Sequence, residues 1–395
     1  MNEKINLLLP EIQANPYPAY AELRRAGPVQ IEPGGVWAIA RHEDATFVLK
    51  NPEIFSVASF APLFKPDWLP HNPLGDTLLT MDGPPHAKLR ALVSRAFTPR
   101  ATERLEPRIR AIAADLSERL TTRAEVDFVA EYTVPLPARA IAEILGVNPA
   151  LHHEFKQWTA ILAAIPAAPP TEAFCAAARK TVADMEGYLK EIVVARRLAP
   201  TDDLVSELVR AEVDGQILTD AEIIAALFLL LAAGFETTSH LLAHMMFVFL
   251  DRPEEFARLR SDRALIPAFV DELLRFGSPA HGVMRMTTAE VEVGGTKLPK
   301  GSVVYVLLGS ANHDEARFPE PDRIDTTRGS QGGMAFGYGA HYCIGAPLGR
   351  LEARVALEEL TARFRGFERL PGKIAWNVAL HVRGPLTLPI RPLVA

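Results

Sequence analysis

Hydrophobic residues recur at helical spacing through most of the chain. This spacing, in which apolar residues return every three or four positions, predicts amphipathic helices. The predicted helices are residues 19–25, 85–96, 100–120, 151–163, 171–197, 219–250, 253–261, 266–276 and 346–363. A Pro/Ala-rich break at residues 165–170 separates two of them.

Strand-like segments lie near the two ends of the sequence. Residues 29–31 and 36–40 alternate around Gly34 and Gly35, which indicates a hairpin. Further strands are predicted at residues 290–293 and 302–307, and the tail at 374–390 resembles a β-hairpin. A loop-rich stretch, residues 313–339, precedes the last helix. The pattern therefore predicts a mainly α fold with a small β-rich part.

One apolar run, residues 225–250, is long enough to span a membrane. Glu236, Thr237, Thr238, Ser239 and His240 interrupt its centre, where polar groups would be costly in lipid. The run is better explained as a buried helix in a large core. Residues 1–10 are too short and too polar at their flanks for a signal peptide, so we expect no membrane partner.

Composition fits a globular protein, with 48% hydrophobic and 23% charged residues. No linker, repeat or low-complexity segment divides the 395 residues, so we expect a single domain over residues 1–395. A net charge of −6 gives no reason to expect nucleic acid as a partner. The two cysteines, Cys175 and Cys343, lie far apart and form no CxxC pair, which indicates a reducing, cytoplasmic compartment.

The segment from Phe336 to Gly345 carries the most chemical information. Gly337 and Gly339 allow positive φ and bring backbone close to a flat object. Cys343 then precedes a helix that carries proline in its first turn. The positive end of a helix favours a thiolate, and a thiolate is the axial haem ligand that promotes O–O cleavage.

Other interpretations of this segment stay open on the residues alone. A lone cysteine is usually an inert core residue. A phosphate-binding loop would need Lys-Ser or Lys-Thr after its last glycine, and this chain has neither there. A nucleophilic thiol would need histidine and asparagine partners elsewhere, which a single sequence does not exclude.

The same segment resembles the haem-binding signature of the cytochrome P450 superfamily, in its soluble bacterial form. The resemblance extends from Asn15-Pro16-Tyr17-Pro18 to the terminal hairpin. It implies the P450 fold and a haem b whose iron is held by Cys343. It also implies that Phe336, Gly337, Gly345 and Ala233 contact the haem.

Glu272-Leu273-Leu274-Arg275 is similar to the family's structural ion-pair motif on the proximal side of the haem. A Glu-x-x-Arg alone is common, because residues three apart share one helix face. In the family a downstream arginine completes this network. Arg323 and Arg328 are both candidates, and the sequence does not distinguish them.

Ala233-Gly234-Phe235-Glu236-Thr237-Thr238 resembles the family's acid–alcohol pair, here with Glu in place of the common Asp. The resemblance implies that Glu236 and Thr237 deliver protons, and that the helix is distorted at Gly234. The structural alternative is that Thr237 bonds back to the carbonyl four residues earlier and that Glu236 pairs with His240.

Haem propionates are anions that need donors. The resemblance assigns His86 and Arg90, on one face of a predicted helix, together with Arg285 and His341. Each could instead be a solvated charge. One departure is His313, where the family often has arginine.

The resemblance places the substrate beside residues 60–69, 158–170, 229–233, 280–283 and 378–380. These segments are mostly apolar, which suits a bulky apolar ligand, although apolar segments are usually core. The implied function is hydroxylation or epoxidation of a polyketide, terpenoid or steroid with O2. Electrons would come from NAD(P)H through a ferredoxin and its reductase. The alternatives are a peroxide-using haem-thiolate oxygenase and a cofactor-free helical binding protein.

Overall fold

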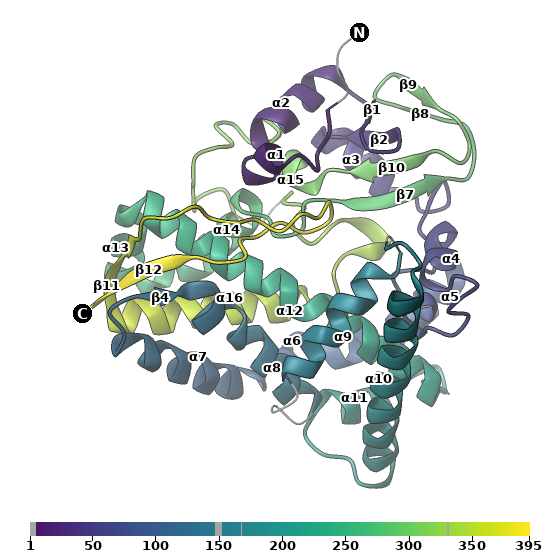
Figure 1. The fold of residues 1–395 in the computed structure, drawn as a ribbon, viewed down its shortest axis with the longest axis horizontal. Helices are drawn as coiled ribbons and strands as arrows, with labels where there is room; N and C mark the ends of the chain where they lie inside the picture. Colours follow the sequence, from purple (N-terminus) through teal and green to yellow (C-terminus); the bar gives the residue numbers. More distant parts are fainter. Residues whose placement is uncertain (1–4, 147–151, 167, 330–331) are drawn as a thin grey trace. The chain divides into compact units, whose positions relative to one another are not determined.

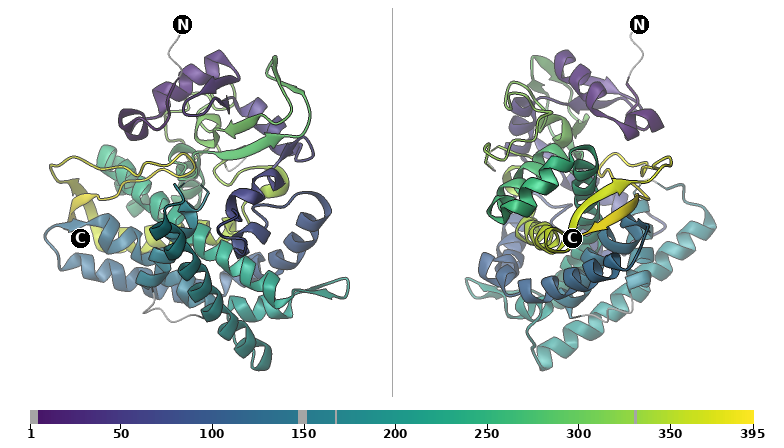
Figure 2. Two further views of the ribbon diagram at one scale, coloured as in Figure 1. Left: turned by 45° about the vertical axis from the view of Figure 1, so that its right-hand side comes forward. Right: turned by 90° about the vertical axis from the view of Figure 1, so that its left-hand side faces the viewer.

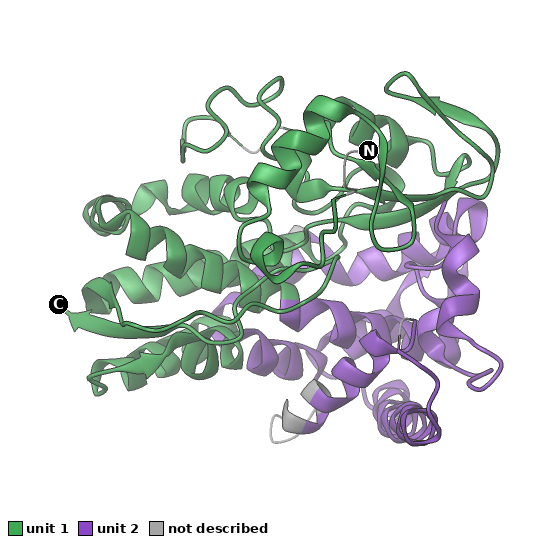
Figure 3. Ribbon diagram, turned by 45° about the horizontal axis from the view of Figure 1, so that its top comes forward, with its two compact units in different colours: residues 1–55, 109–136, 237–395 green, residues 56–108, 137–236 purple. Residues whose placement is uncertain are grey.

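The computed structural model describes residues 5–146, 152–166, 168–329 and 332–395. Leu151, where one predicted helix begins, and residue 167 of the predicted break lie outside them. The described chain is mainly helical with small sheets, as the sequence predicts (Figure 1). It packs as two compact units (Figure 3). Unit 1 comprises residues 1–55, 109–136 and 237–395, and unit 2 comprises residues 56–108 and 137–236.

A five-stranded sheet in unit 1 has the order β1-β2-β10-β7-β3. Its strands are β1 (Val29–Ile31), β2 (Val36–Ile39), β3 (Phe55–Ser56), β7 (Val283–Thr287) and β10 (Val303–Val306). The predicted hairpin β1–β2 is confirmed, and β10 pairs parallel with β2 and antiparallel with β7. Helix α3 (His42–Lys50), which the pattern did not predict, packs Val48 and Leu49 into the same cluster as Val304 and Val306.

The other strands form smaller sheets. Strand β8 (Val291–Val293) pairs with β9 (Thr296–Leu298), and β11 (Phe364–Arg369), β12 (Pro389–Val394) and β4 (Val126–Asp127) form a three-stranded sheet. The predicted hairpin at 374–390 is partly wrong. The chain does reverse there, through a bridge between Trp376 and Pro385, but the regular ladder is β11–β12. Pro385 has no N–H to extend a ladder through the reversal.

Three helices of unit 1 have the predicted bounds: α13 (Pro253–Ser261), α14 (Ile266–Phe276) and α16 (Ala346–Arg363). Each begins with a proline at its first or second position, where the missing N–H costs nothing. Helices α14 and α16 pack against each other. The remaining helices of this unit are α1 (Pro10–Ala14), α2 (Tyr17–Ala26), α15 (Leu308–Ala311), most of α7 (Glu106–Thr121), the short turns Val129–Thr133, Arg263–Leu265 and Gly339–His341, and the second part of α12 (Asp220–Asp251).

Unit 2 is helical apart from the small hairpin β5 (Glu212–Val213) and β6 (Gln216–Ile217). Its longest complete helix, α10, has α9 and α11 packed along it (Figure 2). Its helices are α4 (Ala61–Phe64), α5 (Gly83–Ser94), α6 (Pro99–Glu103), most of α8 (Pro135–Leu145), α9 (His152–Ala164), α10 (Glu172–Leu198), α11 (Leu204–Arg210), the short turns Ala58–Phe60, Pro73–Asp76 and Arg95–Phe97, and the first part of α12.

The single helix predicted over residues 100–120 is two helices, α6 and α7. Pro107 explains the division, because it has no N–H to donate to the carbonyl of Glu103 and is tolerated only in the first turn of the second helix. The side chain of Thr98 accepts from Ala101 N and caps the first of the two.

Helix α12 is long and apolar enough to cross a bilayer by length and composition. Half of its most apolar stretch is buried within the protein, and a core helix passes the same test. The helix is α-helical without interruption from Asp220 to Asp251. The helix is not broken at Gly234, and a Cβ atom there would lie 3.6 Å from Ile141 Cδ1.

Candidate functional site

The loop before α16 is a tight, hydrogen-bonded turn. Gly337 N donates to Met334 O at 2.9 Å, and Cys343 N donates to Phe336 O at 2.9 Å. Gly337 and Gly339 have φ of +72° and +71°, as their predicted role in a turn requires. The backbone around residue 343 is therefore fixed before the helix begins.

Close approach makes Gly339 the more constrained of the two glycines. A Cβ atom at Gly339 would lie 2.3 Å from the carbonyl oxygen of Leu49, at the end of α3. A Cβ atom at Gly337 would have no neighbour closer than 3.8 Å. The turn therefore needs glycine at 339 both for its conformation and for its packing against α3.

The thiol of Cys343 lies on the surface of this turn. Cys343 is exposed and forms no disulfide, whereas Cys175 is buried in α10. Gly345 is the N-cap of α16, and a Cβ atom there would lie 3.8 Å from Cys343 Sγ. The positive end of α16 favours the thiolate. The site thus offers an accessible sulfur ligand with little side-chain bulk beside it.

The Phe336 ring supports the turn from the side of α16. The guanidinium of Arg350 lies 4.6 Å from the ring centroid and donates to Asp271 at 2.8 Å, which ties the turn to α14. Arg350 also donates to the hydroxyl of Tyr342 at 3.3 Å. These contacts, which the sequence did not predict, fix Phe336 and Tyr342, the two ends of the turn that leads to Cys343.

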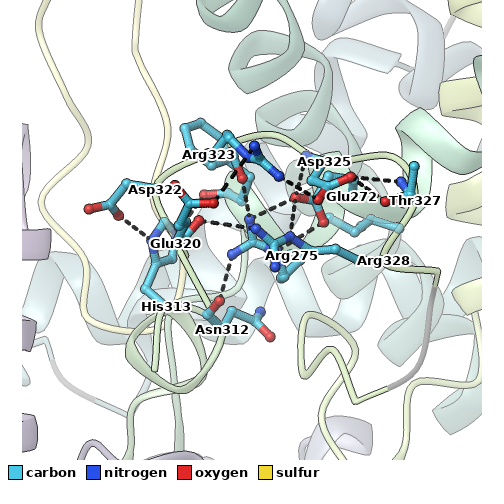
Figure 4. Close-up of polar contacts among 12 residues, drawn as sticks. Glu272, Arg275, Asn312, His313, Glu320, Asp322, Arg323, Asp325, Thr327 and Arg328 are labelled. Carbon is cyan, nitrogen blue, oxygen red and sulfur yellow. Dashed lines mark hydrogen bonds and ion pairs between the residues drawn. The ribbon is translucent and has the colours of Figure 1, made fainter. Parts of the chain in front are cut away.

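Glu272 and Arg275 form the predicted ion pair on α14 (Figure 4). The pair is bidentate, with Arg275 Nη2 at 2.8 Å from Glu272 Oε1 and Arg275 Nε at 2.9 Å from Oε2. The two side chains are 4% and 3% exposed. Arg275 also donates to Asn312 O at 2.8 Å, and Asp325 N donates to Glu272 at 2.9 Å. The pair therefore anchors the long loop that leads to Cys343.

Arg328 is the downstream arginine that completes this network. Its Nε lies 3.4 Å from Glu272 Oε1, and its side chain is 14% exposed. Arg323 is 60% exposed and directs its guanidinium to Asp325 and Glu320, while its backbone carbonyl accepts from Arg275 (Figure 4). The side chain of Arg328 and the backbone carbonyl of Arg323 thus both belong to the network around Glu272 and Arg275.

His313 has a structural part in the same loop. Its Nδ1 lies 2.9 Å from Asp322 Oδ1, and its Nε2 lies 2.9 Å from the carbonyl oxygen of Phe276. Its ring packs on Tyr17 with centroids 4.3 Å apart. The hydrogen bond from His313 lowers the pKa of Asp322. This departure from the family pattern therefore joins the loop to α14 and α2.

The polar residues in the middle of α12, from Glu236 to His240, form two groups that differ in burial. Glu236 and Thr237 are half-buried and Ala233 is exposed, whereas Thr238, Ser239 and His240 are buried. Ser239 Oγ lies 3.2 Å from Thr133 Oγ1. The half-buried acid and hydroxyl are the accessible pair, and the hydroxyl of Ser239 is used within unit 1.

Glu352 is a polar residue of this region that sequence reasoning missed. It lies on α16, 2% exposed, and the hydroxyl of Thr238 donates a hydrogen bond to its carboxyl. Burial raises the pKa of Glu352 to about 8. The available signal was a lone glutamate among the apolar positions Leu348, Leu351 and Val355 of the helix.

The candidate propionate donors lie in both units. Arg285 on β7 is 6% exposed and donates to Met284 O at 2.7 Å, and His341 is half-buried in the turn before Cys343. His86 and Arg90 lie one turn apart on α5. Burial, followed by the charge of Arg90, lowers the pKa of His86, so this histidine is neutral at pH 7. His86 and Arg90 thus share a helix, as the sequence predicts, whereas Arg285 and His341 lie on separate elements.

A sequence profile described as cytochrome P450 matches residues 135–368. The chain belongs to the cytochrome P450 family. It is 39% identical over 373 residues to cytochrome P450 107B1 of Saccharopolyspora erythraea, covering 90% of this chain and 89% of that protein. It is also 39% identical over 365 residues to the cyclomarin C epoxidase CymV of Salinispora arenicola, with 90% of each chain covered.

Solved P450 structures show the same fold. The structure of CYP109Q5 from Chondromyces apiculatus aligns over 100% of both chains with a TM-score of 0.91 and 40% identity. This P450 is therefore a monooxygenase of the bacterial type, and the prediction of a cofactor-free binding protein is wrong.

The residues present fit the haem that the P450 family implies. The turn offers one exposed sulfur, with Gly345 beside it and no acidic residue between Phe336 and Gly345. Arg285, Arg90 and His341 have the donor chemistry that carboxylates require. The exposed thiol and the basic side chains thus have the chemistry that a thiolate-held haem requires.

Proposed function

We propose that Cys343 is the axial thiolate of a haem b and that Arg90, Arg285, His341 and His86 hold its propionates. The observation that carries this proposal is the exposed thiol at the start of α16, in a turn that requires Gly339. In this proposal Phe336, Gly337, Gly345 and Ala233 contact the haem. When bound, the haem supplies the iron at which O2 is reduced and cleaved.

The ligand assignment is tested by Cys343→His. Imidazole also binds haem iron, so some haem should remain, but the thiolate-type spectrum of the reduced carbon monoxide complex should be lost. Cys175→Ser is the matched control and should keep that spectrum. A thiolate-type spectrum in Cys343→His would overturn the assignment.

Glu236 and Thr237 would move protons rather than hold substrate. They are half-buried, whereas the polar residues that follow them in the helix, Thr238, Ser239 and His240, are buried. The Thr237 hydroxyl would accept and donate hydrogen bonds to water, and the Glu236 carboxyl would supply the proton. General acid–base groups typically contribute about 100-fold or more to a rate.

The test measures product formed per NAD(P)H consumed, with hydrogen peroxide assayed in parallel. Thr237→Ala should keep substrate affinity and NAD(P)H consumption but lose product and release peroxide. Glu236→Gln should slow turnover overall. Ser239→Ala, which loses a hydroxyl engaged with Thr133, should stay coupled. A fully coupled Thr237→Ala enzyme would leave the back-bonded structural role as the better account.

The substrate proposed is a bulky apolar small molecule of natural-product metabolism, which the enzyme hydroxylates or epoxidises. The relative named as cyclomarin C epoxidase supports this class. The segments 60–69, 229–233, 280–283 and 378–380 are mostly apolar, which also supports it. Substrate-induced spectral shifts across polyketides, terpenoids, steroids and cyclic peptides would identify the class. Shifts confined to small polar compounds would refute it.

Electrons would reach this P450 from NAD(P)H through a ferredoxin and its reductase in the cytoplasm, and residues 1–395 would act as one domain. The alternative is a peroxide-using haem-thiolate oxygenase. A direct comparison distinguishes the two reactions. If the proposal holds, turnover with a ferredoxin system should exceed turnover with hydrogen peroxide. The presence of Glu236 and Thr237, which a peroxide-driven reaction does not need, favours the reductase-supported reaction.

A further inference from the structure

A small cavity with a mixed apolar and polar lining lies inside unit 1, at the place where the N-terminal segment meets the C-terminal chain reversal. Its free volume is about 10 Å³, which is room for the centre of one water-sized guest. Its polar lining residues are Gln13, Tyr20, His281, Tyr305 and Arg383. The rest of the lining is apolar, and none of its lining residues is acidic.

Strand-like pairing places His281 and Arg383 on the same side of this cavity. Ala280 forms an antiparallel bridge with Val382, flanked by His281 N donating to His381 O and Arg383 N donating to Pro279 O, both at 2.9 Å. Residues one step along each strand from a paired position point to the opposite face from that pair. His281 and Arg383 are therefore diagonal neighbours on one face.

His281 presents an N–H group that has no acceptor among the described residues. Its Nδ1 lies 2.7 Å from the hydroxyl oxygen of Tyr20. The Tyr20 hydroxyl has no other acceptor among the described residues, so it donates to Nδ1, and the proton of neutral His281 is then on Nε2. His281 is 3% exposed, and Nε2 is buried with no hydrogen-bond partner in the described chain. A buried donor left in this state is costly.

Arg383 is a buried cation without a carboxylate partner in the described chain. It is 6% exposed, and it donates from Nε to Gln13 O at 2.8 Å and from Nη2 to Ala14 O at 2.7 Å. Its guanidinium lies 3.7 Å from the centroid of the Trp376 ring. None of these partners carries a compensating negative charge.

Arg383 is the one charged side chain among the described residues that line the cavity. Burial first, then Arg383, His244, His313 and His240, lower the pKa of His281 well below its ordinary value. Burial lowers the pKa of Arg383 as well, and the phenols of Tyr17 and Tyr20 are the groups that oppose this. No acidic side chain acts on either group. The cavity is therefore electropositive and kept from acidic neighbours.

We propose that this cavity binds one monovalent anion of the size of chloride, between the Arg383 guanidinium and His281 Nε2–H. Chloride fits a space for one water-sized guest, accepts from N–H donors and supplies the missing negative charge. The bound anion would join the backbone of residues 13–14 to the reversal at residues 376–385, and so stabilise both ends of unit 1.

The first test is the thermal unfolding of the haem-loaded enzyme at constant ionic strength. Replacing gluconate, which is too large for the cavity, by chloride should raise the unfolding midpoint by about 2 °C or more. His281→Phe should abolish this rise. His71→Phe is the matched control, because it replaces an exposed histidine that does not line the cavity, and it should retain the rise.

The second test does not depend on whether a variant folds. Crystals of the unaltered enzyme grown with bromide should show an anomalous peak between Arg383 Nη1 and His281 Nε2. A peak without any halide effect on stability in solution would mean binding at crystal concentration only and would overturn the proposal. Ordinary water density at that position, or an equal response of His281→Phe and the unaltered enzyme to chloride, would overturn it as well.

Discussion

Glu352→Gln should change how the stability of this P450 depends on pH. Glu352 is 2% exposed on α16, and its pKa is raised by burial from 4.5 to about 8, although the hydrogen bond from Thr238 opposes the change. Glutamine has nearly the same shape and can still accept from Thr238. The substitution therefore removes a titrating group from the core with little change in packing.

The sign follows from the two protonation states. In the unfolded chain the carboxyl loses its proton near pH 4.5, whereas in the folded protein it keeps the proton until about pH 8. Between these values the unfolded state binds fewer protons, so the free energy of unfolding falls as the pH rises. A pKa difference of about 3.5 corresponds to a loss of about 5 kcal/mol by the end of that interval.

Urea unfolding of the haem-loaded enzyme at about pH 6 and about pH 8.5 measures the effect. The difference in unfolding free energy between Glu352→Gln and the unaltered protein should grow by about 2–3 kcal/mol from the lower to the higher pH. It is smaller than the full change because the unaltered protein has already lost part of its stability at about pH 6. Glu254→Gln, at an exposed position on α13, should show no such growth. An equal advantage of Glu352→Gln at both pH values would refute the raised pKa.

Three further outcomes follow from the described contacts. Arg328→Ala should cost about 2 kcal/mol of unfolding free energy in urea titrations, because it weakens the support of buried Glu272, whereas exposed Arg323→Ala should change it by less than about 0.5 kcal/mol. Gly339→Ala should lower stability and haem content much more than Gly337→Ala, because the Gly337 variant carries only about 1–2 kcal/mol of backbone strain and no clash. Calorimetry and haem absorbance measure the two effects, and equal effects in the two variants would contradict the packing argument. Arg95→Glu, at an exposed position just after α5, should raise the KM for ferredoxin and flatten its salt dependence in steady-state assays, unless docking occurs elsewhere.

The helices that the sequence predicted with the right bounds are those with local signals at their ends. Helices α13, α14 and α16 each begin with proline, and apolar spacing continues to the last turn. Helix α3 and strands β7 and β9 were not predicted, because short elements depend on distant partners. Strand β7, for example, is a strand because β10 lies beside it.

Local features of the site were likewise easier to predict than features that depend on distant residues. The turn at Gly337 and Gly339 is local in sequence, so its glycines predicted it. The pair Glu272–Arg275 is also local, but it was predicted from the family resemblance, because its spacing alone is common. The choice of Arg328 over Arg323 depends on how a long loop folds back onto α14, which no local pattern encodes. Glu352 was missed for a related reason: its partner Thr238 lies more than a hundred residues away.

The parallel pairing of β2 with β10 has a consequence for synthesis. Ile39 lies opposite Val306, so the central strand of the sheet leaves the ribosome some 267 residues after its neighbour. At about 5–20 residues per second, the β1–β2 hairpin waits roughly 13–54 s with one edge unpaired. Exposed edges invite pairing with other chains. A nascent chain of this P450 therefore needs an edge-covering chaperone most during that interval, and rare codons placed between the two strands would lengthen the exposure.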